Sequence, residues 1–421
     1  MPRPTGCGAF AVQLQIDVGY PCTLDAEKTP EKLVNLDLTE EQKLLQRSVR
    51  DFAEAEVKPL AKELDETGRF PLESVRKAAE LGLTGISVPE KYGGAGMDHI
   101  CYSIVMEEIA RVCASTSVIL SVQNSLYCAS IDRFGNEEQK QKFLPGLCTG
   151  ELLAAAAFTE PDAGSDSAGI KCRAVKKGDK YVISGEKTWC TWANKAHLLC
   201  TTVVTNPEAP RKHDRLSILL IPKTPGDDFH PPQLAGSPIP TIGYKGMNSY
   251  SLQFDGYECP AENLLSGVEG KGFRQLMSTY EIARIQTAAR AVGVAQAAFE
   301  AALRYSQERT QFGKPISDFQ VIGHKLAHMA TQIEAGRQLT YHAARMKDTG
   351  KRCDLEAGMA KAFCAEMAEH VTSEAMQVFG GYGYSREFPA QRFWRDARVF
   401  RIFEGTSEIQ YEVIAKRLLE G

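Results

Sequence analysis

The spacing of hydrophobic residues changes twice along the 421-residue chain, and this change is the strongest constraint on its fold. Residues 37–150 carry hydrophobic side chains at intervals of three and four, as amphipathic helices do. Residues 151–268 contain short β-type runs between turn residues, and residues 269–421 return to the helical interval. The pattern predicts an α+β multidomain protein with an N-terminal helical domain, a middle antiparallel β-barrel or sandwich, and a C-terminal four-helix bundle.

The first helical segment has a clear start. Thr39 and Gln42 have the spacing of a capping box, in which each side chain bonds the other residue's backbone N–H. Helical spacing then continues to Pro59. A second helix follows Pro71 and is expected to stop at Gly82, because glycine readily adopts the left-handed conformation that ends many helices.

The later segments are predicted from composition and spacing. The β-type segments, bounded by turn signals, cover residues 154–158, 181–183, 198–204, 216–221 and 251–254. The four long amphipathic segments, which predict an up-down bundle, cover residues 275–309, 317–348, 354–379 and 407–419.

The first 36 residues are expected to lie outside the fold. They contain Pro and Gly at irregular intervals and both acidic and basic side chains, which fits neither a signal peptide nor an Arg-rich transit peptide. We interpret them as a loose tail or as a consequence of the choice of start site.

Composition argues against several classes of protein. A net charge of −4 does not favour a nucleic-acid partner, and no apolar run approaches the roughly 20 residues that span a bilayer. Twelve cysteines are scattered without a Cys-x-x-Cys pair, which predicts reduced, buried thiols in a reducing compartment.

A glutamate near the C-terminus is the strongest candidate for chemistry. Glu404 follows two apolar residues and precedes a glycine and two hydroxyl residues, Thr406 and Ser407, either of which can cap the final helix. A carboxylate among apolar neighbours is poorly solvated, which makes it a better proton acceptor near neutral pH. The simpler alternative is a favourable charge at a helix N-terminus.

Other motifs suit a large planar ligand, and each has a simpler structural alternative. The loop at residues 158–166 offers backbone N–H groups and hydroxyls to a ligand, or is a plain surface turn. Trp189 and Thr191 can contact a planar ring, although a lone tryptophan is more often a core residue. Arg309 can bind a pyrophosphate or act as a helix C-terminal cation. The glycines of residues 380–383 approach a ligand or end a helix.

No metal site is predicted. His324 and His328 have the spacing of the two histidines of a zinc motif, but the segment lacks the glutamate of that motif, and no third ligand is evident. A pair on a helix surface is the better interpretation.

Together these motifs, in this order, resemble the acyl-CoA dehydrogenase family over about residues 37–421. The first half is most similar to short-chain members and the second half to the methylsuccinyl-CoA type. The first likeness rests on residues 92–96, 106–109, 113–116 and 121–126. The second rests on residues 267–270, 283–290 and 352–359.

The resemblance implies the cofactor and its site, with one FAD per subunit of a homotetramer. The implied cofactor-binding positions are Thr159, Trp189, Thr191, Arg309, Phe312, Gln377, Gly381 and Thr406. The first three would contact the flavin ring, and the next four would contact the FAD of a neighbouring subunit. Ser165 and Arg284 fall where the family contacts coenzyme A.

The resemblance also implies the reaction. Glu404 stands where most members carry the base that removes the α-proton of an acyl-CoA, while the β-hydride passes to flavin N5 and a trans-2,3-enoyl-CoA forms. A minority place the base just before the residue equivalent to Arg284, but Ala283 stands there. Electrons are expected to pass to electron-transfer flavoprotein in the bacterial cytoplasm, or alternatively in the mitochondrial matrix. The alternative classes are a flavin acyl-CoA oxidase and a desulfinase-like lyase on the same scaffold.

Two departures from the family bear on the acyl group. Phe403 stands where a tyrosine is common, and residues 244–249 replace a small Ser/Thr-rich run. The first half of the chain favours a short or substituted short acyl-CoA, and the second half favours a 2-alkyl- or 2-aryl-succinyl-CoA. A distal carboxylate needs a cation, for which Lys245 and Arg290 are the candidates.

Overall fold

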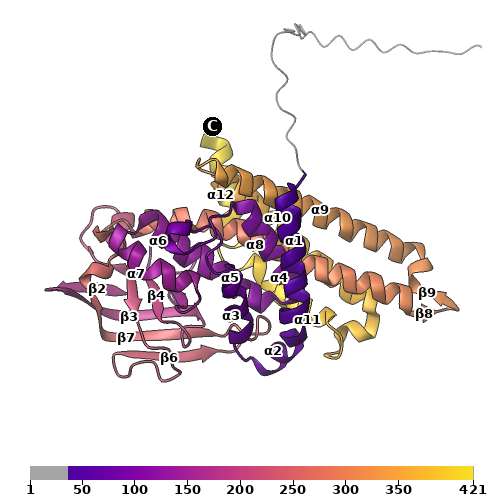
Figure 1. Cartoon of the computed structure of the whole chain (residues 1–421), viewed down its shortest axis with the longest axis horizontal. Coiled ribbons are helices and arrows are strands. Elements are labelled where there is room, and N and C mark those ends of the chain that lie inside the picture. The colour runs from indigo at the N-terminus through magenta and orange to yellow at the C-terminus, as the bar shows by residue number, and fades with distance from the viewer. Residues whose placement is uncertain (1–36, 421) are drawn as a thin grey trace, which may run out of the picture. The chain divides into compact units, whose positions relative to one another are not determined.

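The computed structural model describes residues 37–420 (Figure 1). The predicted N-terminal tail, residues 1–36, therefore lies outside the described residues. Within the described part the chain runs from helices through a sheet and back to helices, which confirms the predicted order.

The N-terminal part contains seven α-helices in the described residues, of which the first and the third begin where the sequence predicts. They are α1 (Glu40–Phe52), α2 (Ala61–Thr67), α3 (Leu72–Glu80), α4 (His99–Val112), α5 (Ala114–Val122), α6 (Ala129–Phe134) and α7 (Glu137–Cys148). The capping box is confirmed, since Thr39 Oγ1 accepts from the Gln42 N–H at 3.2 Å and Gln42 Oε1 accepts from the Thr39 N–H at 3.1 Å. Gly82 follows α3 with φ of +74°, as a helix stop requires.

The middle part is one curled sheet of seven strands. They are β1 (Ala154–Ala157), β2 (Arg173–Lys177), β3 (Lys180–Thr191), β4 (Leu198–Val204), β5 (Leu216–Pro222), β6 (Leu234–Ile239) and β7 (Ser249–Pro260). Their order is β1-β4-β2-β3-β7-β6, with β5 also paired to β4. Two strands are not predicted from the sequence. β2 is mostly exposed and polar, and β6 contains Gly236 and Pro238, which are unusual in a strand and fit its place at the sheet edge.

The prediction of a purely antiparallel sheet is wrong at β4, which pairs in parallel with β1 and, at the single residue pair of Arg173 and Val204, with β2. β1 runs parallel to β4, with Ala154 opposite Leu198 and Ala157 opposite Thr201. A parallel pair needs a long crossover connection, and residues 158–197, which include β2 and β3, supply it. Whether β1 is parallel or antiparallel to its neighbour therefore depends on the path of the chain between β1 and β4. The four alanines of β1 contain no information about that path.

The C-terminal part contains the four predicted long helices and one shorter helix. They are α8 (Gly272–Glu308), α9 (Gln320–Asp348), α10 (Asp354–Phe379), α11 (Ala390–Arg398) and α12 (Ser407–Glu420). A small hairpin of β8 (Thr310–Gln311) and β9 (Lys314–Pro315) joins α8 to α9. α8 is buried along most of its length, so it is the helix against which the other parts pack.

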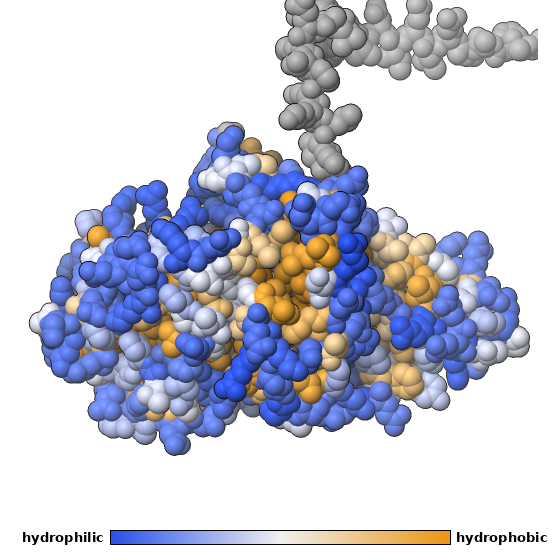
Figure 2. Space-filling model, viewed as in Figure 1, coloured by the Kyte–Doolittle hydropathy of each residue, from blue (hydrophilic) through white to orange (hydrophobic). Residues whose placement is uncertain are grey.

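The surface and the thiols agree with the composition. The space-filling view is mostly hydrophilic, with hydrophobic residues gathered in the middle of one face beside α1 (Figure 2). Ten cysteines fall in the described residues; all ten are unpaired and nine are buried, as predicted. Among residues 37–420, no helix combines the length and apolar character needed to cross a bilayer.

Candidate active site

Glu404 lies on a strained turn between α11 and α12. Its φ is +53° and that of Gly405 is +86°, a conformation that is unfavourable for a glutamate and easy for a glycine. The turn directs the carboxylate inward, as the low exposure of the side chain, 11%, shows. Thr406 caps α12 through its hydroxyl, which accepts from the Ile409 N–H at 3.3 Å. Such strain at an enclosed carboxylate is typical of functional sites.

The partners of the carboxylate come from α8, which lies far away in the sequence. Arg290 Nη2 donates to Glu404 Oε1 at 2.9 Å, and the Thr287 hydroxyl donates to Oε2. These contacts, rather than the N-terminus of α12, account for the position of Glu404. The alternative that it serves only as a helix-terminus charge is therefore not favoured.

Two residues that sequence analysis missed hold the turn in place. The ammonium group of Lys361, a fully buried residue of α10, donates to the Gly405 carbonyl at 2.5 Å. Gln410 Nε2 donates to the same carbonyl at 3.0 Å. Burial lowers the pKa of Lys361 to about 8, although the negative charge of Glu404 opposes this shift. A single lysine in the otherwise small and apolar stretch around it was the available signal.

We expect Lys361→Met to change how stability depends on pH. The folded protein holds this proton with a pKa of about 8, whereas the unfolded chain holds it near 10.5, so the unfolded chain binds more protons between these values. Stability of the wild-type protein must then rise with pH in this window relative to the variant, by up to about 3 kcal/mol. Denaturant unfolding of both proteins at pH 7.5 and pH 10 measures the effect. A stability difference that stays the same at both pH values would contradict the buried position.

Trp189 lies at an irregularity of β3. The pairing of β3 with β7 shifts between Lys187 and Cys190, and Trp189 has φ of +57°. The bulge turns its ring outward, so that 55% of the residue is exposed. The interpretation of Trp189 as a core residue is wrong, and the core tryptophan is the fully buried Trp192.

The structure brings Thr159 and Thr191 close to Trp189. β1 ends beside the bulge, where the Thr188 N–H donates to the Thr159 carbonyl at 2.9 Å. Thr191 lies two residues beyond Trp189 at the end of β3. Both Thr159 and Thr191 are half-buried, so an exposed ring lies beside partly accessible polar side chains.

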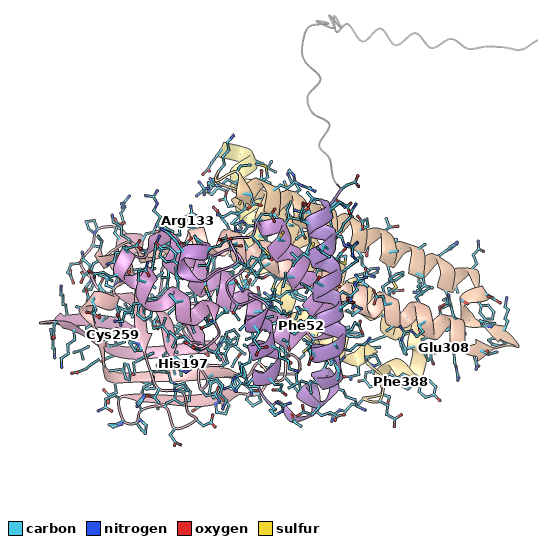
Figure 3. All side chains as sticks on the ribbon, viewed as in Figure 1. Phe52, Arg133, His197, Cys259, Glu308 and Phe388 are labelled. Atoms are coloured by element: carbon cyan, nitrogen blue, oxygen red, sulfur yellow. The ribbon has the colours of Figure 1, made fainter. Side chains whose placement is uncertain are left out.

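The other predicted cofactor residues, apart from Thr406, gather at the end of the C-terminal helices that is remote from the sheet. They are Arg309, Phe312, Gln377 and Gly381. The rings of Tyr305 and Phe379 stack at 4.2 Å, which joins the ends of α8 and α10, and Phe312 is 94% exposed. The labelled Glu308 and Phe388 mark this end, whereas His197 and Cys259 mark the sheet at the opposite end (Figure 3). The sheet group and the bundle group are therefore separate within one chain.

The predicted substrate residues have different environments. Ser165 is exposed in the loop after β1. Arg284 is buried on α8, and burial lowers its pKa from the usual value, although Glu404 is among the charges that oppose the shift. Lys245 lines a small cavity with Asp65 and Asp396, and forms no hydrogen bond or ion pair with Glu404. Of the two candidate cations for a distal carboxylate, Arg290 is the one beside Glu404.

Three aromatic rings surround the Arg290 guanidinium. Its carbon lies 5.2 Å from the ring centre of Phe403 and 5.9 Å from that of Phe400. The Tyr244 ring packs edge-on against both, at 6.0 Å and 6.1 Å. The two sequence departures, Phe403 and the segment of Tyr244, therefore meet beside Glu404.

Two other features of the described residues do not contribute to this site. An open cavity of about 880 Å³ lies between the turn before α3 and the sheet, and no predicted site residue lines it. Within residues 37–420, no three His, Cys, Asp or Glu side chains are grouped as metal ligands would be.

Comparison with known proteins identifies the same similarity in all three parts. Models of the acyl-CoA dehydrogenase N-terminal, middle and C-terminal domains match residues 39–151, 155–257 and 270–419. The (2S)-methylsuccinyl-CoA dehydrogenase of Cereibacter sphaeroides is 44% identical over 91% of this chain and 70% of that protein. The mitochondrial short-chain specific acyl-CoA dehydrogenase of Mus musculus is 40% identical over 92% of each. The solved structure of butyryl-CoA dehydrogenase from Megasphaera elsdenii has a TM-score of 0.86 at 38% identity, covering 91% of this chain and 99% of that one.

Proposed function

Because the chain belongs to the acyl-CoA dehydrogenase family of oxidoreductases, which act on CH–CH groups, we propose that it oxidises a short or substituted short acyl-CoA to its trans-2,3-enoyl-CoA. The observation that carries the proposal is the enclosed Glu404 carboxylate on its strained turn. The alternative position for the base, just before Arg284, holds the fully buried Ala283, which has no carboxylate. Glu404 is therefore the proposed base.

The α-C–H bond of a thioester is too weak an acid for a carboxylate unless the carbonyl is polarised. The backbone N–H of Glu404 donates to no residue within 37–420, so it is free to bond a thioester oxygen. One preorganised donor of this kind is typically worth about 3–4 kcal/mol. Glu404 then receives the α-proton on a carboxylate oxygen, and the electrons of that C–H bond form the new double bond as the β-hydride leaves.

The residues around Trp189 fit the flavin that this family uses. An exposed indole on a strained bulge gives a flat ring a face to pack against, and Thr159 and Thr191 supply polar groups beside it. When bound, FAD supplies the acceptor for the β-hydride. The Thr406 hydroxyl accepts a hydrogen bond from the Ile409 N–H and also bonds the Glu408 carboxylate, whose pKa it helps to lower.

The separation of the bundle group from the sheet group supports a homotetramer in which one subunit contacts the FAD of another. Phe312 offers a highly exposed ring on the hairpin, and Arg309 lies nearby with its guanidinium carbon 5.4 Å from the ring centre of Tyr382. We propose electron-transfer flavoprotein as the acceptor of the electrons, in keeping with the family.

The test is anaerobic bleaching of the bound flavin, titrated separately with butyryl-CoA and with methylsuccinyl-CoA. Stoichiometric bleaching by either substrate is the expected result. Purified protein without a yellow chromophore, or flavin that neither substrate bleaches, would overturn the proposal. Rapid reoxidation of the bleached flavin by oxygen would support an oxidase instead, and cleavage of a sulfinate substrate would support the lyase.

A further inference from the structure

Arg290 has more hydrogen-bonding capacity than the folded chain uses. Its side chain is fully buried, and its Nη2 donates to Glu404 Oε1 and to Thr287 Oγ1, each at 2.9 Å. Its Nε and Nη1 are buried as well, and neither has a hydrogen-bond partner within residues 37–420. Burying an unsatisfied charged donor is unfavourable, so the two nitrogens point to an acceptor that the chain does not supply.

A second unused donor lies in the same place. The Tyr244 hydroxyl is buried and forms no hydrogen bond of normal geometry in the described part of the chain. It lies beside the Arg290 guanidinium, whose positive charge partly opposes the rise in the phenol pKa that burial causes. Its ring packs against Phe400 and Phe403, the two rings that also lie beside the guanidinium of Arg290. The apolar rings of Phe400 and Phe403 next to Glu404 thus lie against two donor groups, the guanidinium of Arg290 and the phenol of Tyr244. Both groups can donate hydrogen bonds to a carboxylate.

The ion pair with Glu404 occupies only one nitrogen of the Arg290 guanidinium, Nη2. A second carboxylate can therefore bind at Nε and Nη1, which are buried and without a partner in the described part of the chain. The guanidinium then shares its positive charge between this ligand and Glu404.

We propose that Arg290, together with Tyr244, binds a carboxylate carried on the β-carbon of the acyl group, so that the substrate class is a 2-substituted succinyl-CoA. This inference rests on the proposed dehydrogenase function. Glu404 acts on the α-carbon and contacts Arg290 directly, so the recognised anion must lie close to the reacting carbons. A carboxylate on the next carbon meets this requirement better than one on a longer chain.

The proposed reaction is balanced without a further reactant. The α-proton would pass to Glu404, and FAD, when bound, would supply the acceptor for the β-hydride. The bond between the α- and β-carbons becomes double, and the distal carboxylate stays in place. The product is a 2-butenedioyl thioester that keeps the substituent on its α-carbon.

The first test compares kcat/KM of the wild-type holoenzyme and Arg290→Gln with methylsuccinyl-CoA and with butyryl-CoA. Because Arg290 also holds Glu404, both values should fall, and we expect the loss with methylsuccinyl-CoA to exceed the loss with butyryl-CoA by at least about tenfold. The matched control is Lys347→Met. It removes a cation from another buried ion pair, in which Lys347 of α9 lies 2.7 Å from Glu281 of α8. The ratio of the two kcat/KM values should not change in this control.

The second test needs no turnover and no change of Arg290. In Glu404→Gln the competing carboxylate is gone, so succinyl-CoA should bind about tenfold more tightly than to the wild-type protein. Butyryl-CoA, which has no carboxylate, should bind with a Kd within about threefold of the wild-type value. Titration calorimetry of the FAD-loaded proteins measures both.

Several results would overturn the inference. Equal losses with both substrates in Arg290→Gln would mean that Arg290 only positions Glu404. An equal effect of Glu404→Gln on the two ligands would exclude competition for Arg290. If butyryl-CoA bleaches the wild-type flavin and methylsuccinyl-CoA does not, this inference is wrong and the proposed dehydrogenase function is still supported. If neither substrate bleaches the flavin, the proposed function itself is wrong.

Discussion

Glu404→Gln is expected to lower turnover at least a hundredfold while the protein still folds, binds FAD and binds acyl-CoA. The amide keeps the size of the side chain and can still accept from Arg290 and pair with the Thr287 hydroxyl. It has no lone pair basic enough to take a proton, and a positioned general base typically contributes about 10²–10⁴-fold. Anaerobic flavin bleaching in rapid-mixing experiments measures the chemical step directly.

Glu404→Asp is the control for this variant. It keeps a carboxylate but withdraws it by one methylene, so we expect activity between that of the wild type and that of Glu404→Gln. Bound FAD, counted from the visible absorbance per chain, should equal the wild-type value in both variants. If Glu404→Gln keeps more than about one per cent of turnover, another group removes the proton.

Gly293→Ala is expected to destabilise the protein by about 2–4 kcal/mol, although alanine favours helices. Gly293 lies on α8 where this helix crosses α4, and an added Cβ would lie 2.3 Å from the Glu107 carbonyl oxygen and 2.9 Å from the Ala110 Cβ. The helix propensity gain of about 1 kcal/mol cannot offset a clash with backbone, because the two helices would have to move apart. Denaturant-induced unfolding measures the change.

Gly323→Ala is the matched control. Gly323 lies in α9, and an added Cβ there meets no atom within 4 Å. The same substitution should then stabilise the protein by about 0.5–1 kcal/mol through helix propensity alone. Opposite signs for the two variants would confirm that close packing of α4 on α8 requires a glycine at position 293, and equal signs would contradict it.

Sequence reasoning succeeded where the signal lies among neighbouring residues. The capping box of Thr39 and Gln42 and the stop at Gly82 are local, and both occur in the structure. The turn of Glu404 was likewise predicted from its neighbours, and only the choice between Thr406 and Ser407 as the cap remained open. Sequence reasoning failed for β2, whose polar residues lack the pattern of a buried strand, and for the direction of β1.

The function of individual side chains was harder to predict than the elements that carry them. Trp189 and Trp192 are close neighbours in the chain, but one ring is exposed and the other is buried because a bulge lies in β3. Lys245 and Arg290 were equal candidates for binding an anion, and only Arg290 lies beside Glu404. Lys361 was missed because its partner, the Gly405 carbonyl, lies on a different segment.

The sequence by itself determined the succession of helices, strands and helices and placed a glutamate on a turn before the last helix. These features depend on hydrophobic spacing and on turn and cap residues that lie within a few positions of one another. Only the tertiary structure decided that Arg290, Thr287 and Lys361 meet at that turn, and that Arg290 keeps two donors unused. Contacts of this kind join segments that are distant in the chain, so they follow from how α8 and α10 pack rather than from any local pattern.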